Sequence, residues 1–269
     1  GEARTALFAR YSLTGALFAA LGALAAGVPE GLARFGVGLL PALRMMFVVY
    51  AMAGFAIWLL YRQLPRASDE TVAAPPVALG PSRGVVTRLA ALFSLDAFAG
   101  GLLVQSLLAL WLFERFDLSL TTAAVFFFWT GLMSAISQLA APWLARRIGL
   151  LNTMVFTHIP SSLALIAAAF APRVEIALGL LLVRAALSQM DVPTRSAYVM
   201  SVVTPAERTA AASYTAVPRS LASALSPTLG GAMLAAGWMA APLLACGVLK
   251  IVYDLTLLRV FRRVRLESQ

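Results

Sequence analysis

The stretch from Arg184 to Arg208 decides the fold, and it reads R-A-A-L-S-Q-M-D-V-P-T-R-S-A-Y-V-M-S-V-V-T-P-A-E-R. It lies in a run apolar enough for a membrane helix, yet it carries Arg184, Ser188, Asp191 and Arg195. At about 100° per residue these four side chains fall within roughly 60° of one another and form one polar stripe. Ionisable groups in a membrane are costly and typically mark a pathway, a relay or a paired core site. The stretch therefore predicts a membrane helix with one polar face.

Composition places the rest of the chain in a membrane as well. Apolar residues make up 61% of the 269 residues and charged residues 12%, against typical values of about 45–50% and about 25%. One soluble core could not cover that much apolar surface. Segments long enough to span a bilayer lie at about 7–27, 39–61, 86–112, 119–143, 150–171, 174–200, 210–236 and 240–261. The sequence thus predicts an all-α membrane protein with eight transmembrane helices.

Basic residues in the loops predict the orientation of these helices. One side of the membrane collects Arg4, Arg10, Arg62, Arg66, Arg83, Arg88, Arg146, Arg147, Arg208, Arg259, Arg262, Arg263 and Arg265. The other side collects Arg34, Arg115 and Arg173. By the positive-inside rule the first side is cytoplasmic, as is the C-terminus, which predicts a multi-pass protein of the cell (inner) membrane. This bias accounts for most of the net charge of +9, so nucleic acid is not an expected partner. The lipid bilayer is the expected environment and partner.

A linker and a repeat predict two halves. The polar stretch 65–84 holds four prolines, Asp69 and Glu70, and it separates the second and third segments, whereas the other connections are short. The start of the first segment also matches the start of the seventh. In one register Arg4-Thr5-Ala6, Leu17, Ala20, Leu21 and Gly27 meet Arg208-Thr209-Ala210, Leu221, Ala224, Leu225 and Gly231. Such parallel repeats are typical of transporters built from two similar halves.

Several of these features resemble the major facilitator superfamily (MFS). The polar-striped helix that stops at Thr204-Pro205-Ala206-Glu207-Arg208 resembles the tenth helix of such a transporter. The loop P-W-L-A-R-R-I-G, from Pro142 to Gly149, resembles the G-x-L-A-D-R-x-G motif through Leu144, Arg147 and Gly149, with Pro142 and Arg146 in place of its first glycine and aspartate. The run Q-M-D-V-P-T-R (189–195) is similar to one in uncharacterised bacterial members.

The resemblance implies an MFS-type bundle in which this chain would hold helices five to twelve of twelve. Residues 1–64 would be the last two helices of the N-terminal half, 65–85 the cytoplasmic linker, and 86–269 the complete C-terminal six-helix half. Because the seventh segment pairs with the first, Gly1 is expected to be a truncation point, with four helices missing upstream. The resemblance further implies a secondary transporter of a small molecule, with a coupling proton, efflux as one direction, and a monomer when full length.

Polar side chains inside the predicted helices are the candidates for a proton and substrate pathway. They are Asp96, Gln105, Gln138, His158, Arg184, Ser188, Gln189, Asp191, Arg195 and Arg219. Asp96 lies about 12 Å along its segment from Arg88, and it is expected either to carry a proton or to bond a neighbouring hydroxyl. Asp191 has Arg195 four positions later, which favours a structural ion pair over proton carriage.

Four further residues, Lys250, Asp254, Arg219 and His158, allow more than one interpretation. Lys250 and Asp254 are expected to neutralise each other as an i, i+4 pair. Arg219 has no acid on its own helix, so its expected partner is Asp96 or Asp191. His158, the one histidine, is expected to be a packing residue, with a proton relay as the alternative. Because Asp96 has no base near it on its own helix, it is the expected coupling carboxylate.

The sequence contains no recognisable catalytic arrangement. There is no H-E-x-x-H, no G-x-S-x-G and no P-loop lysine motif. With a single cysteine, Cys246, and a single histidine, neither a metal cluster nor a cofactor is expected. The prediction is therefore a transporter rather than an enzyme. The alternatives are an MFS-fold sensor or scaffold without transport, and a membrane-embedded enzyme, which would need a paired intramembrane dyad.

Overall fold

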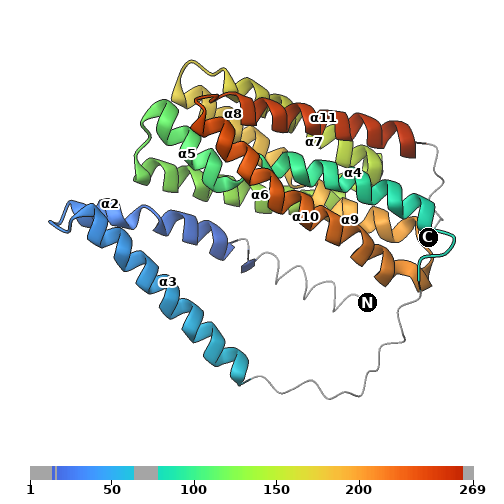
Figure 1. Ribbon diagram of the computed structural model, residues 1–269, viewed down its shortest axis with the longest axis horizontal. Helices are drawn as coiled ribbons and strands as arrows, with labels where there is room; N and C mark the ends of the chain where they lie inside the picture. The colour runs from blue at the N-terminus through green and yellow to red at the C-terminus, as the bar shows by residue number, and fades with distance from the viewer. Residues whose placement is uncertain (1–13, 16, 64–77, 263–269) are drawn as a thin grey trace.

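The computed structural model describes residues 14–15, 17–63 and 78–262, and the elements in these ranges are helices (Figure 1). The predicted all-α class is therefore confirmed for this part of the chain. The helices are α2 (Val28–Ala33), α3 (Leu39–Arg62), α4 (Arg83–Gly101), α5 (Gln105–Phe116), α6 (Leu120–Ile148), α7 (Leu150–Ala169), α8 (Val174–Ser188), α9 (Asp191–Ser201), η1 (Pro205–Glu207), α10 (Arg208–Ala235) and α11 (Ala241–Phe261).

Six helical stretches in the described ranges are long and apolar enough to cross a membrane, namely Leu39–Arg62, Arg83–Phe116, Leu120–Ile148, Leu150–Ala169, Val174–Ser201 and Ala241–Phe261. Their length and composition indicate a multi-pass membrane protein. Of the two other predicted spans, α10 has sufficient length with 28 residues but is rich in Ala, Ser, Thr and Gly. The span at 7–27 begins outside the described residues, and its described part belongs to a shorter apolar stretch, Leu17–Ala33.

Two of these six stretches, each predicted from the sequence as one span, contain a short interruption of the helix. The segment 86–112 is divided into α4 and α5 by Leu102–Val104, with Val104 in an extended conformation. The segment 174–200 is divided into α8 and α9 near Gln189. Pro193 explains the second interruption, because proline has no N–H to donate and its ring clashes with the carbonyl four residues earlier, which belongs to Gln189.

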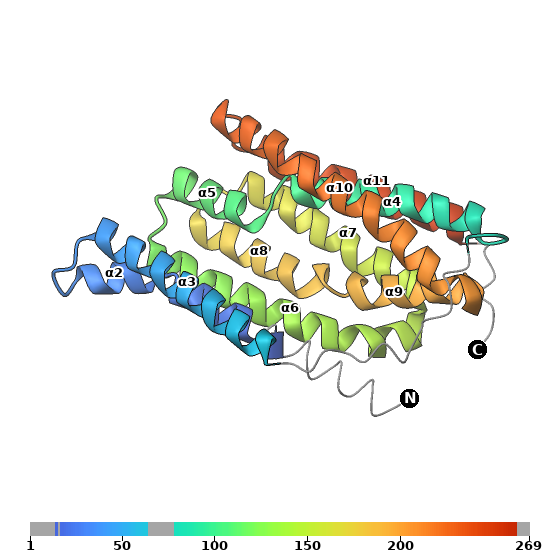
Figure 2. The same ribbon diagram turned by 60° about the horizontal axis from the view of Figure 1, so that its bottom comes forward.

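The first interruption coincides with very close packing of α10 (Figure 2). A Cβ atom on Gly230 would overlap the carbonyl oxygen of Leu102, and one on Gly101 would overlap the Ser226 hydroxyl. Glycine at both positions therefore lets the two helices approach closely, and at Gly230 a side chain would meet backbone atoms. Two consecutive glycines, Gly100 and Gly101, also weaken the end of α4, because glycine is a poor helix former.

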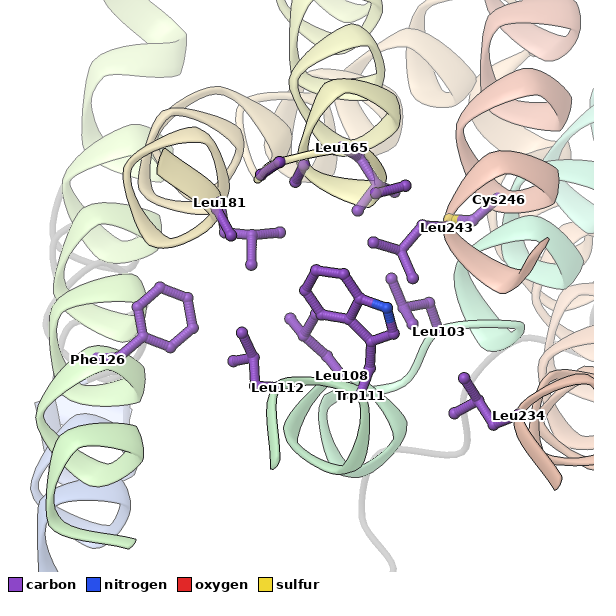
Figure 3. Packing of buried hydrophobic residues seen from close by; sticks show 14 of the residues in the cluster. Leu103, Leu108, Trp111, Leu112, Phe126, Leu165, Leu181, Leu234, Leu243 and Cys246 are labelled. Carbon is purple, nitrogen blue, oxygen red and sulfur yellow. The ribbon is translucent and has the colours of Figure 1, made fainter. Parts of the chain in front are cut away.

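Buried apolar side chains gather in two clusters at opposite ends of the bundle. The Trp111 cluster (Figure 3) includes Leu112, Leu165, Leu181 and Leu243. The Tyr253 cluster includes Phe93, Met154, Tyr198 and Leu257. The same helices contribute to both: on α7, Met154 precedes Leu165, and on α11, Leu243 precedes Tyr253. The middle of α7 and the middle of α11, between the two clusters, therefore carry other side chains.

Of the helices before residue 64, α2 contacts α6, whereas α3 contacts α2 and diverges from the bundle (Figure 1). The Glu30 carboxylate accepts the backbone N–H of Thr121 at 2.6 Å, while Ser119 caps the same helix end by accepting the N–H of Thr122. The hydrogen bond from Thr121 lowers the pKa of Glu30. On α3, Ala42 is the one buried residue. The predicted divisions 1–64, 65–85 and 86–269 and the repeat from residue 4 fall partly outside the described residues and stay predictions.

Candidate functional site: a charged cavity between two interrupted helices

A cavity of about 540 Å³ lies where both interrupted helices meet α7, α10 and α11. Val104 of the first interruption and Gln189 of the second line its wall, as does Gly101, the last residue of α4. Backbone that leaves the helical pattern inside a membrane is tolerated where it is buried in protein or lines a polar cavity. The lining residues lie between the Trp111 cluster and the Tyr253 cluster along the helices, so the cavity is at mid-length of the bundle.

Lys250 is the centre of a hydrogen-bonded chain of ionisable groups at this cavity. Its Nζ donates to Asp96 Oδ1 at 2.6 Å and lies 3.2 Å from His158 Nε2. His158 Nδ1 lies 3.1 Å from Asp254 Oδ1. Because an ammonium group can only donate, Nε2 must accept, and the proton of a neutral imidazole is then on Nδ1 and is donated to Asp254. Asp254 is fully buried and His158 nearly so.

Arg195 extends this chain to the second interrupted helix. Its guanidinium pairs with Asp191 on the same helix and lies 3.4 Å from Asp96 Oδ2. It also lies 5.4 Å from the centre of the Phe93 ring, in a cation–π contact. Asp96 therefore interacts with two cations from two other helices. The resulting network, which runs from Asp254 through His158, Lys250, Asp96 and Arg195 to Asp191, connects α4, α7, α9 and α11.

Most of the predicted pathway residues line this one cavity, namely Asp96, His158, Arg184, Ser188, Gln189, Asp191, Arg195 and Arg219. Gln105 and Gln138 do not: Gln105 is exposed at the start of α5, and Gln138 lies half-buried on α6. The loop residues Leu144, Arg146, Arg147 and Gly149 are at the end of α6, away from the cavity. There Arg147 stacks 4.3 Å from the Trp143 ring centre.

One predicted pairing is present in the structure and the others are not. The Asp191–Arg195 pair is present. The expected Lys250–Asp254 pair is not among the ion pairs of the described residues, because Lys250 bonds Asp96 and His158 instead. Asp96 has no base near it on its own helix, as expected, but Lys250 and Arg195 from two other helices pair with it. Arg219 pairs with neither Asp96 nor Asp191 in the part of the chain that the structure describes.

Sequence reasoning missed some of the cavity wall. Ser161, Ser220, Ser223 and Lys250 line it, and none of them was a pathway candidate. A signal for Lys250 existed, since a lysine in the middle of an apolar segment needs a partner. The serines carried no signal, because serine is common in helix contacts within membranes. Among the described residues, no group of His, Cys, Asp and Glu side chains is arranged to hold a metal ion.

A second polar contact ties the segment before α4 to the start of α10. The Glu207 carboxylate accepts hydrogen bonds from the Ser82 hydroxyl at 2.6 Å, the Thr204 hydroxyl at 2.8 Å and the backbone N–H of Gly80. These hydrogen bonds, that of Ser82 foremost, lower the pKa of Glu207 to about 2. The contact lies on the side that the distribution of arginines predicts to be cytoplasmic. We refer to it as the Glu207 contact.

Comparisons of the chain with protein-family models, curated proteins and solved structures find no match. What the protein does is therefore inferred from the geometry of the cavity.

Proposed function

We propose that the protein is a secondary active transporter that moves a small molecule by alternating access, with a proton as the coupling ion. The observation that carries the proposal is the cavity with buried ionisable groups at mid-length of the bundle. Secondary transporters typically bind their substrates near the membrane midplane, at interrupted helices. Both the interruption between α4 and α5 and that between α8 and α9 border this cavity.

The two apolar clusters support the same proposal. The Trp111 cluster and the Tyr253 cluster lie on either side of the cavity along the bundle. In alternating access, each end of the bundle must in turn close the path to water, and packed apolar side chains are suited to that. The interruptions provide places where the helices can bend without loss of regular hydrogen bonds.

We further propose that residues from α4 to α11 are one six-helix half of an MFS-type bundle. If each interrupted pair is counted as one helix, this part of the chain contains Arg83–Phe116, Leu120–Ile148, Leu150–Ala169, Val174–Ser201, Arg208–Ala235 and Ala241–Phe261. That order agrees with the predicted C-terminal half. Superposing the first three of these helices on the last three tests it, since the MFS arrangement requires two three-helix units related by an inverted repeat.

The direct test is flux in proteoliposomes. Purified protein is reconstituted, and uptake of a panel of labelled small molecules is followed with and without an imposed pH gradient. The proposal predicts saturable, protein-dependent flux of at least one compound, accelerated by the gradient. Binding of a compound without any flux would instead support the sensor or scaffold alternative. Chemical conversion of the compound without net movement would support a membrane-embedded enzyme.

A further inference from the structure

We infer that the cavity takes a small oxyanion, a molecule bearing a carboxylate or phosphate group, and that Arg184 and Arg219 bind it. The inference rests on the proposed function, because it assumes that this cavity is the substrate site. The first observation is that the cavity wall carries a net positive charge. Four basic side chains (Arg184, Arg195, Arg219 and Lys250) face two acidic ones (Asp96 and Asp191). With His158 neutral, the described lining carries an excess of two positive charges.

The four basic groups are not equivalent. Lys250 and Arg195 are held by Asp96 and Asp191, at the contacts given above. Arg184 and Arg219 form no ion pair with any acid among the described residues. Asp254 does not change this result, because it lies behind His158, is fully buried and bonds the imidazole. The unbalanced charge of the cavity is therefore at Arg184 and Arg219.

These two arginines reach the cavity from different helices. Arg184 lies four residues before Ser188, the last residue of α8, and Arg219 follows Pro218 in the middle of α10. Hydroxyl and amide groups lie in the same wall, on Ser188, Gln189, Ser220 and Ser223. Guanidinium groups suit carboxylate and phosphate because their planar N–H donors bind two oxygens at once. Hydroxyl and amide donors can bond the remaining oxygens.

A cationic substrate fits this wall poorly. Both carboxylates that face the cavity already accept hydrogen bonds from Lys250 or Arg195, so a cation would have to displace an internal pair. It would also meet the charge of Arg184 and Arg219. An anion removes that excess instead, and charged groups inside a membrane protein typically pair or face a water-filled cavity. The volume of about 540 Å³ is within the usual range for sites that hold one small molecule.

Binding to the reconstituted protein tests the inference with four probes at equal ionic strength: inorganic phosphate, succinate, tetraethylammonium and glucose. We expect phosphate or succinate to bind, with Arg184→Gln and Arg219→Gln each weakening the affinity by roughly 10- to 100-fold. Arg184→Lys should retain part of it. Arg173→Gln and Arg208→Gln are matched controls, because they remove exposed arginines at the starts of the same two helices, outside the cavity, and should leave affinity unchanged. The two oxyanion probes separate carboxylate from phosphate recognition.

The outcomes separate this inference from the proposed function. Oxyanion binding that depends on both arginines supports the anion site, and if no flux accompanies it, the transport proposal alone fails. Flux of tetraethylammonium or glucose without oxyanion binding overturns the anion site and leaves transport standing. Failure of both oxyanions to bind, or affinity unchanged in Arg184→Gln and Arg219→Gln, also overturns it. Melting curves without ligand verify that each variant is folded.

Discussion

The direction of a helix explains why one of two similar charge pairs forms and the other does not. Side chains on a helix lean toward its N-terminus, so an acid at position i meets a base at i+4 better than the reverse order. Asp191 and Arg195 have the favourable order, and they pair. Lys250 and Asp254 have the reverse order, and Lys250 pairs with Asp96 on another helix. Asp254 contacts His158 instead.

Removing Lys250 should therefore destabilise the bundle. In Lys250→Met, Asp96 loses its closest cation and His158 loses a donor, and breaking a buried pair from one side costs about 3–5 kcal/mol. Because Arg195 still faces Asp96, we expect the lower end of that range. Thermal unfolding in detergent measures it, with Arg259→Met, an exposed position of the same helix, as the control. Equal stability of the two variants would contradict the pairing.

His158 and Asp254 are the pair that we expect to couple the protein to a proton, in place of Asp96. Asp96 faces two cations that hold its charge, whereas the hydrogen bond between His158 and Asp254 already contains a proton that can be passed on. In His158→Gln, the amide can still accept from Lys250 but cannot take up a proton. Flux driven by a pH gradient should be lost, while exchange of substrate without a gradient continues. Gradient-driven flux that survives in this variant would exclude His158 as the carrier.

Among the described helices, α10 and the interrupted α4–α5 pair are in very close contact. This contact predicts which glycine of α10 cannot be replaced without loss of stability. Gly230→Ala would place a methyl group against the carbonyl oxygen of Leu102, and overpacking of this kind costs about 1–3 kcal/mol. Gly231→Ala is the matched control, because its new methyl group would lie 3.8 Å from Leu107, an ordinary contact. We expect a lower melting temperature for Gly230→Ala alone. Similar melting temperatures for both variants would show that the helices are not packed in this way.

The Glu207 contact predicts how stability depends on pH. Its hydrogen bonds lower the pKa of Glu207 from 4.5 to about 2, so folding favours the ionised carboxylate. This stabilisation is complete above pH 4.5 and is lost as the pH falls toward 2. Glu207→Gln should lower the melting temperature at neutral pH and flatten its decrease between pH 4.5 and 2. The exposed Glu175, replaced by Gln, serves as the control. A profile as steep as that of the unchanged protein would mean that other groups are responsible.

For the whole molecule, the distribution of arginines predicts which end of the bundle faces the cytoplasm. The single cysteine, Cys246, is buried, so Cys246→Ser provides a background free of thiols. In that background, a membrane-impermeant maleimide added to intact cells should label Pro172→Cys, between α7 and α8. It should not label Arg147→Cys, at the end of α6. The opposite pattern would reverse the orientation, and with it the side on which the Glu207 contact lies.

The sequence by itself determined the class of the protein and most of its helices. Membrane helices form from local apolar runs whose backbone must bond internally, so composition and segment length were enough to predict an all-α multi-pass chain. The same local reasoning predicted the Asp191–Arg195 pair, since four residues on one helix fix their geometry. It also brought Asp96, His158, Arg184 and Arg219 forward as candidates, because ionisable groups in apolar segments are rare.

Tertiary structure alone decided how those candidates combine. Lys250 and Asp96 are 154 residues apart in sequence, and nothing local specifies that α4 and α11 place them in contact. The division of α4 from α5 likewise depends on α10, whose Gly230 lets its backbone rest on Leu102. Charges in a membrane must find partners wherever packing brings them. Within the described part of the chain, packing leaves Arg184 and Arg219 without an acidic partner, which is a property of the fold rather than of either helix.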